Sequence, residues 1–172
     1  LGIGGVRALR LLGITPKVWH MNEGHSAFLT FECIRELVAA GLDFNAAVEK
    51  VKSETVFTTH TPVPAGNEEF PDWMMDRYFS HYWPSLGLTR DSLMDLARLQ
   101  QSWGTSFGMS VLAIRMSRLS NGVSELHGQV SRKMWQFLFP STPVERVPIG
   151  AITNGVHTGS WLARGMRDLY NR

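Results

Sequence analysis

The strongest constraint on the fold is a repeated alternation between short β-type runs and amphipathic helical stretches. Four runs rich in β-branched or apolar residues lie at 17–21, 55–59, 109–114 and 147–153. Strands that alternate with helical stretches are typical of βαβ units, in which crossover helices join parallel strands. The sequence therefore predicts one α/β unit over residues 1–172. We expect a Rossmann-like, mostly parallel sheet with these four runs as its strands and helices on both faces.

The helices are predicted from apolar residues spaced three or four positions apart and from typical N-capping residues, such as Asp43 and Thr89. The expected helices cover residues 6–12, 26–39, 43–52, 72–82, 90–101 and 123–137. The last of them is expected to bury one apolar face, formed by Val123, Leu126, Val130, Met134 and Phe137.

Polar, uncharged side chains collect where the predicted strands end. The exit segments 20–25, 60–67, 120–124 and 153–157 are rich in histidine, asparagine and glycine. In open parallel sheets, ligands bind beyond the carboxyl ends of the strands. Imidazole and amide groups both donate and accept hydrogen bonds, which suits a polar, hydroxyl-rich ligand such as a sugar.

Each of these polar residues also has a structural explanation. His20 alternates within a strand, so we expect a satisfied core or edge histidine. Glu23 precedes a predicted helix and could cap it. The dipeptides Asn121-Gly122 and Asn154-Gly155 are common turn formers. His60 precedes a proline-rich turn, and the spacing alone leaves both of its explanations open.

Composition excludes several classes of function. The formal net charge is only +2 and no basic block is present, so we expect no nucleic-acid partner. The single cysteine, Cys33, rules out a disulfide framework and a cysteine-based zinc site, and it fits a reducing cytoplasm. No apolar run approaches the ~20 residues of a membrane span, so no membrane partner is expected. The residues 20–25 lack the metal-binding His-Glu-x-x-His spacing, so we expect no metal site.

Four ordered motifs carry a family resemblance. They are VWHMNEGHSAF (18–28), TTHTPVPAGN (58–67), SNGVSELHG (120–128) and ITNGVH (152–157), and the opening LGIGGVR (1–7) fits as well. Together they resemble the α-glucan (glycogen/maltodextrin) phosphorylase family in its shorter bacterial and archaeal form. The resemblance implies a two-lobed glycosyltransferase B fold. The chain, which lacks an initiator methionine, is expected to be an internal piece of such a protein, from the later part of the N-terminal lobe.

The resemblance also implies a cytoplasmic transferase of carbohydrate metabolism. Family members use orthophosphate to release glucose 1-phosphate, with retention, from the non-reducing end of an α-1,4-glucan. By the same resemblance, His60 is the histidine that contacts the bound glucosyl unit near its 6-hydroxyl, partly through its backbone carbonyl. Asn154 is the asparagine that hydrogen-bonds the same sugar. Glu23 and His25 match residues near the entrance of the active site and have supporting roles.

The family cofactor is pyridoxal phosphate, bound as a Schiff base to a lysine of the C-terminal lobe. None of the lysines here lies in the matching motif, so no cofactor-binding and no catalytic residue is assigned in this chain. The isolated chain is therefore expected to be inactive and to need the C-terminal lobe as its partner. The resemblance is compatible with a homo-oligomer. A non-catalytic α/β domain that binds a sugar or a nucleotide is the alternative.

Overall fold

A four-stranded parallel sheet forms the centre of the molecule in the computed structural model, which describes residues 1–102 and 104–171. Its strands are β1 (Trp19–Asn22), β2 (Thr55–Thr59), β6 (Leu119–Gly122) and β7 (Ile149–Ala151), in the spatial order β1-β2-β6-β7. Every neighbouring pair is parallel. The prediction of an α/β, Rossmann-like, mostly parallel sheet is confirmed.

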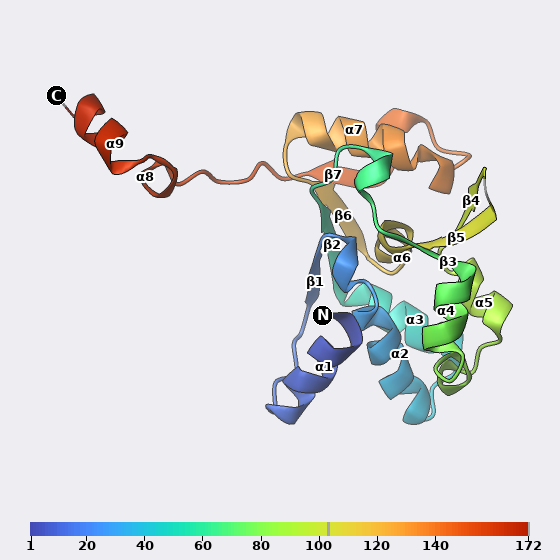
Figure 1. Cartoon of the computed structure of the whole chain (residues 1–172). Helices are drawn as coiled ribbons and strands as arrows, with labels where there is room; N and C mark the ends of the chain where they lie inside the picture. The colour runs from blue at the N-terminus through green and yellow to red at the C-terminus, as the bar shows by residue number, and fades with distance from the viewer. Residues whose placement is uncertain (103, 172) are drawn as a thin grey trace.

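The connecting helices cover one face of this sheet, so the prediction of helices on both faces is wrong for the described residues (Figure 1). The strand order progresses in a single direction from β1 to β7. Crossover connections between parallel strands are right-handed, so successive steps in one direction place every crossover on the same side. The opposite face carries the row His20, Val56 and Leu119, and the Leu119 side chain is 60% exposed there.

The predicted strand over 109–114 is also wrong, because this run forms helix α6 (Met109–Arg115). Each residue from 109 to 114 is buried, so the run has no polar, exposed face and shows no helical period. A short continuous apolar run cannot be assigned to helix or strand by periodicity alone. The strand that follows it, β6, lies in the segment that the sequence suggested as a strand exit.

A second sheet was not predicted. It is antiparallel, with the order β3-β5-β4, and consists of β3 (Glu69–Pro71), β4 (Arg98–Gln101) and β5 (Gly104–Gly108). The helix expected over 90–101 ends early, as α5 (Arg90–Asp95), because the backbone of 98–101 pairs with β5 instead. Here tertiary pairing overrides a weak helical preference.

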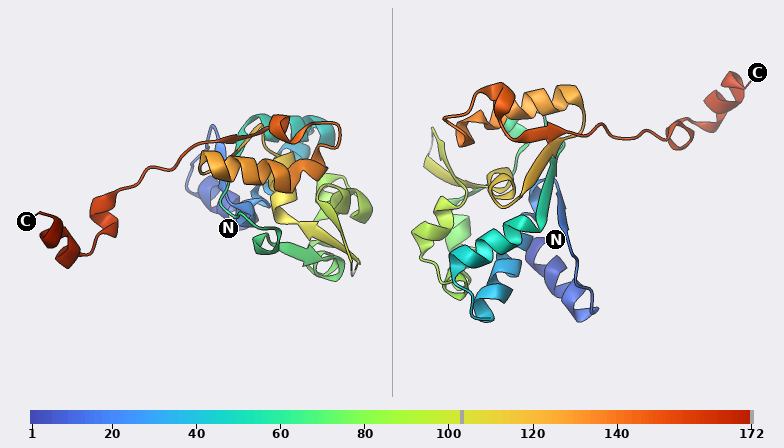
Figure 2. Two further views of the ribbon diagram at one scale, coloured as in Figure 1. Left: turned by 90° about the horizontal axis from the view of Figure 1, so that it is seen from above. Right: turned by 180° about the vertical axis from the view of Figure 1, so that it is seen from behind.

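The remaining helices follow the prediction more closely. They are α1 (Gly2–Leu11), α2 (Leu29–Ala39), α3 (Phe44–Ser53), α4 (Asp72–Phe79) and α7 (Glu125–Trp135). Both predicted N-caps are present: the Asp43 carboxylate accepts hydrogen bonds from the backbone at Asn45 and Ala46, and the Thr89 hydroxyl accepts one from the backbone at Ser92. After β7 the chain leaves the body as an extended segment that carries α8 (Thr158–Trp161) and α9 (Arg164–Tyr170), as Figures 1 and 2 show.

Helix α7 buries a different face from the predicted one. Its buried residues are His127, Gly128, Ser131 and Trp135, whereas Leu126 and Phe137 are mostly exposed. A Cβ atom added at Gly128 would lie 3.0 Å from the Cβ of Ala151 and 3.1 Å from the carbonyl oxygen of Gly150. The small residues thus allow α7 to lie directly on β7, and close packing decides which side faces the sheet.

An aromatic cluster forms part of the core. Phe28 lies 4.6 Å from Phe79, 5.6 Å from Phe31 and 5.9 Å from Phe107, measured between ring centroids. Two of these ring pairs are tilted and the third is stacked, and centroid separations in this range are favourable for aromatic side chains. The cluster joins α2, α4 and β5 in one core.

Beside this core lies a fully buried carboxylate, Glu32 of α2. It accepts hydrogen bonds from Arg7 (2.9 and 3.0 Å), from Arg35 (2.6 and 3.1 Å) and from the Tyr82 hydroxyl (2.6 Å). Burial by itself raises the pKa of the Glu32 carboxyl, but the bonds from Arg35, Arg7 and Tyr82 outweigh it and lower this pKa to about 2. Glu32 therefore stays charged and joins α1 to α2 and to the segment after α4.

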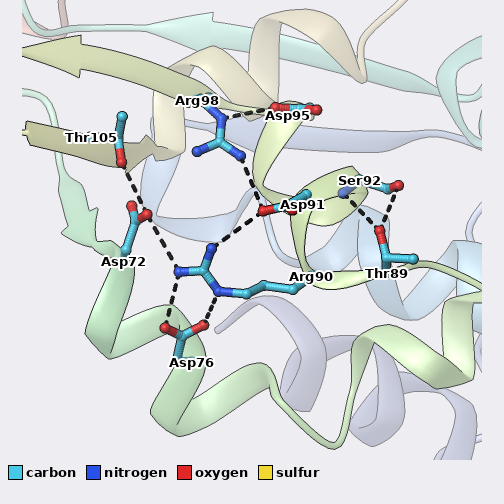
Figure 3. A network of polar contacts seen from close by, with 9 residues as sticks. All are labelled: Asp72, Asp76, Thr89, Arg90, Asp91, Ser92, Asp95, Arg98 and Thr105. Carbon is cyan, nitrogen blue, oxygen red and sulfur yellow. Dashed lines mark hydrogen bonds and ion pairs between the residues drawn. The ribbon is translucent and has the colours of Figure 1, made fainter.

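A second polar network lies on the surface between α4 and α5 (Figure 3). The Arg90 guanidinium binds both carboxylate oxygens of Asp76, at 2.5 and 3.0 Å, and also contacts Asp72 and Asp91. The Thr105 hydroxyl donates to Asp72 at 3.0 Å, which adds β5 to the network. This network is structural, because its carboxylates are already paired with arginines.

No helix in the described part of the chain is long and apolar enough to cross a membrane.

Candidate functional site

The candidate site lies at the carboxyl edge of the parallel sheet. Since β1, β2, β6 and β7 all run in the same direction, the residues that follow them emerge at one edge. Glu23 follows β1, His60 follows β2, and Asn154 lies three residues beyond β7. β2 and β7 are separated by β6 alone, which corresponds to two strand spacings, or roughly 10 Å. The shared edge of His60 and Asn154 is thus a feature of the fold, while the contact of these two residues with a sugar stays a prediction.

Glu23 precedes the short helix η1 (Gly24–Ser26), but its side chain makes no capping hydrogen bond there, contrary to the structural explanation offered from sequence. Its carboxylate accepts hydrogen bonds from the backbone N–H groups of His60 (2.8 Å) and Thr61 (3.0 Å) and from the Thr61 hydroxyl (2.9 Å). A longer bond of 3.3 Å comes from the Thr59 hydroxyl. Sequence spacing could not reveal this role, because the partners lie 36 to 38 positions away.

The backbone of Glu23 is held in an unfavourable conformation. Its φ angle is +75°, and it is the one non-glycine residue with positive φ in the described ranges. Such a conformation costs on the order of 1–3 kcal/mol and persists only where surrounding contacts enforce it. Here the charge-assisted bonds to residues 59–61 supply that enforcement.

The ring of His60 is held by Asn22, the last residue of β1. Nε2 of His60 lies 2.5 Å from Oδ1 of Asn22. Beside this pair, a chain of hydrogen bonds crosses the open face of the sheet: Nε2 of His20 lies 2.8 Å from the Thr58 hydroxyl, which donates to Oδ1 of Asn121 at 3.0 Å. His20 is therefore a satisfied histidine on edge strand β1, as predicted.

His25 lies on a different side of Glu23. It belongs to the short helix η1 (Gly24–Ser26) and lines a cavity of about 210 Å³ together with Glu23, Asn67 and Ser110. No hydrogen bond in the described ranges joins His25 to the other three predicted site residues. The structure thus brings Glu23 and His60 into contact. His25 and Asn154 lie at the same edge of the sheet, but among the residues that the structure describes neither is hydrogen-bonded to this pair.

Ser110 is a residue that the sequence reasoning missed. Its hydroxyl donates to Oδ1 of Asn67 at 2.7 Å. A Cβ atom added at Gly24 would lie 2.9 Å from this hydroxyl oxygen, so Gly24 allows η1 to approach α6. Because 109–114 was expected to be a strand, nothing in the sequence indicated that Ser110 would reach this edge.

The described residues offer neither a metal site nor a reactive thiol. No group of three or more histidine, cysteine, aspartate or glutamate side chains in these ranges could hold a metal ion. Cys33 is buried, and burial raises the pKa of its thiol to about 12, which keeps it protonated and unreactive.

Neither Lys50 nor Lys52 lies where it could hold pyridoxal phosphate at this edge. Lys50 pairs with Glu54 on the surface. Lys52 lines a cavity of about 390 Å³ with Arg115 and Arg118, but these residues lie near the amino ends of β2 and β6, at the opposite edge of the sheet. Cations in the last turns of α3 and α6 also complement the helix dipoles, which accounts for Lys52 and Arg115.

Comparison with known proteins gives a consistent set of relatives. The chain is 43% identical to the maltodextrin phosphorylase of Thermococcus litoralis over its full length. It is 46% identical to the glycogen phosphorylase of Mycobacterium tuberculosis over 94% of the chain, and 32% identical to that of Aquifex aeolicus over 99%. The chain spans 20–24% of the length of these relatives. No family model matches it.

Proposed function

Along its whole length the chain is homologous to the α-glucan (glycogen/maltodextrin) phosphorylases, and on this premise we propose that it forms the later part of the N-terminal lobe of such an enzyme. The whole protein would be a cytoplasmic glycosyltransferase with two lobes. It would use orthophosphate to release glucose 1-phosphate from the non-reducing end of an α-1,4-glucan. Identities of 32–46% to relatives named as phosphorylases support this proposal.

The single structural observation that carries the proposal is the shared edge of His60 and Asn154. Residues 94 positions apart in sequence follow parallel strands separated by one neighbour. Both side chains are exposed, so neither is needed to fill the core. In our proposal they hydrogen-bond the terminal glucosyl unit, with Glu23 and His25 as supporting residues.

The C-terminal lobe of the same protein would supply the remaining parts of the reaction. It would hold pyridoxal phosphate, whose phosphate supplies acid–base chemistry toward the substrate phosphate in this family. Lys50 is paired with Glu54, and Lys52 lies near the amino ends of β2 and β6, so neither supports a cofactor site at the edge that carries His60. We therefore assign to these residues only the binding and orientation of the sugar.

The proposal is tested by substitution in the full-length enzyme. His60→Ala and Asn154→Ala should each lower kcat/KM for maltodextrin phosphorolysis, and the melting temperature should stay close to that of the parent. One lost hydrogen bond corresponds to roughly a two- to tenfold decrease, and more if a buried partner is left unsatisfied. His60→Ala should show the smaller effect wherever the backbone carbonyl makes the contact. Unchanged kcat/KM in both variants would contradict the shared sugar site.

A second experiment tests the assignment of the cofactor to the missing lobe. The purified 172-residue chain should release no glucose 1-phosphate from maltodextrin and should show no cofactor absorbance after incubation with pyridoxal phosphate. Phosphorolysis by this chain alone would refute the need for a second lobe.

A further inference from the structure

Two adjacent residues of β1 and its exit hold His60 at two separate points. Glu23 binds the backbone N–H of His60, and Asn22 binds its ring through Oδ1 and Nε2. A histidine that only marks a strand exit would need neither contact, because exposed side chains and loop N–H groups are satisfied by water. The double restraint indicates that both the position and the chemistry of the ring are controlled.

The Asn22 contact determines where the proton of the imidazole lies. Oδ1 of an asparagine carries no hydrogen and can only accept a hydrogen bond. Nε2 of His60 must therefore be the donor in the 2.5 Å contact. A neutral imidazole has a single N–H, so Nδ1 is left with a lone pair and can only accept. Among the described residues, nothing occupies Nδ1 with a hydrogen bond.

We propose that Asn22 and Glu23 are positioning residues for His60: Glu23 fixes its backbone, and Asn22 fixes its ring as the Nε2–H tautomer, so that Nδ1 accepts a hydrogen bond from a sugar hydroxyl. This inference rests on the proposed function for the identity of the ligand. The tautomer and its cause are properties of the chain itself. The site then selects a ligand group that can donate a hydrogen bond at this point.

The tautomer is measured directly, without any ligand. Chain labelled with ¹⁵N-histidine is studied by long-range ¹H–¹⁵N correlation at about pH 8, where an ordinary imidazole is neutral. His60 should show a protonated Nε2 and an unprotonated Nδ1. Asn22→Ala should shift the tautomer ratio to that of the same histidine in the urea-unfolded chain. Asn22→Asp, which keeps an acceptor at this place, should restore the parent ratio.

The matched control is Asn121→Ala. This substitution removes another asparagine from the same edge, but its partner is Thr58 and not His60. It should leave the His60 tautomer unchanged. An Nδ1–H tautomer in the parent chain, or equal ratios in the parent and Asn22→Ala, would overturn the role of Asn22.

The role of Glu23 is read from backbone hydrogen exchange. Glu23→Gln removes the charge from an acceptor of the N–H groups of His60 and Thr61, so these two amides should exchange at least several-fold faster. Amides within β2 should keep their rates, which separates a local release from general unfolding. Unchanged exchange at both amides would overturn this half of the proposal.

The functional consequence is measured in the full-length enzyme. Asn22→Ala should raise KM for glucose 1-phosphate roughly two- to tenfold in the synthetic direction, and Asn22→Asp should restore it. A 6-deoxy-6-fluoro analogue cannot donate a hydrogen bond, so it should be a poor substrate for the parent and should lose little more in Asn22→Ala. A confirmed tautomer with no such discrimination would contradict the sugar site and leave the positioning of His60 intact.

Discussion

The replacement Glu32→Gln should strongly destabilise the fold at neutral pH. The Glu32 side chain is fully buried and accepts bonds from two arginines and a tyrosine. Its pKa falls from an ordinary value of 4.5 to about 2 on folding. At about 1.4 kcal/mol for each pH unit, the charged form contributes about 3 kcal/mol. Removal of one partner from a buried ion pair typically costs roughly 3–5 kcal/mol, which agrees.

The sign of the pH dependence follows from the lowered pKa. Between pH 4.5 and 2 the unfolded chain binds more protons than the folded chain, so stability falls as the pH falls. The contribution of Glu32 is complete above about pH 5 and is lost toward pH 2. The difference in stability between the parent and Glu32→Gln should therefore be about 3 kcal/mol at pH 7 and roughly half of that or less at pH 3.

Urea unfolding of the chain, followed by tryptophan fluorescence at several pH values, measures this difference. The matched control is Glu36→Gln, one turn further along α2, where Glu36 pairs with Arg10 and both side chains are about one-third exposed. This control should cost less than about 1 kcal/mol. A loss below about 1 kcal/mol for Glu32→Gln, or a loss that is equal at pH 7 and pH 3, would refute the reasoning.

Three further substitutions test the fold by the same urea titration. Asp43→Ala removes the N-cap of α3 and should cost about 1 kcal/mol, whereas Asp43→Asn should be nearly neutral. Gly128→Ala forces α7 away from Ala151 and should cost roughly 1–3 kcal/mol, so an unchanged midpoint would contradict the close packing. Arg90→Met breaks the two bonds to Asp76, a partly exposed pair, and should cost no more than about 1 kcal/mol, with a smaller loss in 1 M salt.

The features predicted correctly are those that depend on residues close to one another in the sequence. The β-branched run at 55–59 became β2 with the same bounds, and Asp43 and Thr89 cap helices because their side chains bind N–H groups only two or three residues away. The features predicted wrongly depend on distant partners. The run 109–114 is buried on all sides, so its helix shows no period in the sequence, and residues 98–101 form a strand because β5 is available to pair with them.

The same distinction holds for the candidate site. The common edge of His60 and Asn154 could be predicted, because it follows from parallel strands alone. The role of Glu23 could not, since it depends on the register between β1 and β2, which places Asn22 opposite Thr58 and so brings Glu23 beside residues 59–61. Ser110 was missed for a similar reason, because its place at the edge depends on α6 being a helix.

Three connections hold the exits of the strands together, and two of them, from β2 to β6 and from β6 to β7, set the separation of His60 from Asn154. Glu23 joins the exit of β1 to the exit of β2 at His60. The ladder between β2 and β6 joins the two central strands from Val56 to Thr59. Beyond β7, the backbone N–H groups of Ile152 and Asn154 donate to the carbonyl oxygens of Gly122 and Val123, at 3.0 and 3.1 Å, which joins the exit of β7 to the exit of β6.

Two of these connections are backbone hydrogen bonds, and the third is the charge-assisted bond from the His60 N–H to the half-buried Glu23 carboxylate, so the edge is held together before any ligand arrives. A preorganised pair of hydrogen-bonding side chains loses little conformational entropy when a sugar binds. Under the proposed function, weakening a connection should therefore reduce sugar affinity in the full-length enzyme even where neither His60 nor Asn154 is altered. Gly122→Ala provides such a case, because its new Cβ would lie 2.8 Å from Nδ1 of His127 and 2.9 Å from the backbone nitrogen of Gly128. The resulting shift of β6 against α7 would move the carbonyl oxygens of Gly122 and Val123, which accept the bonds from Ile152 and Asn154.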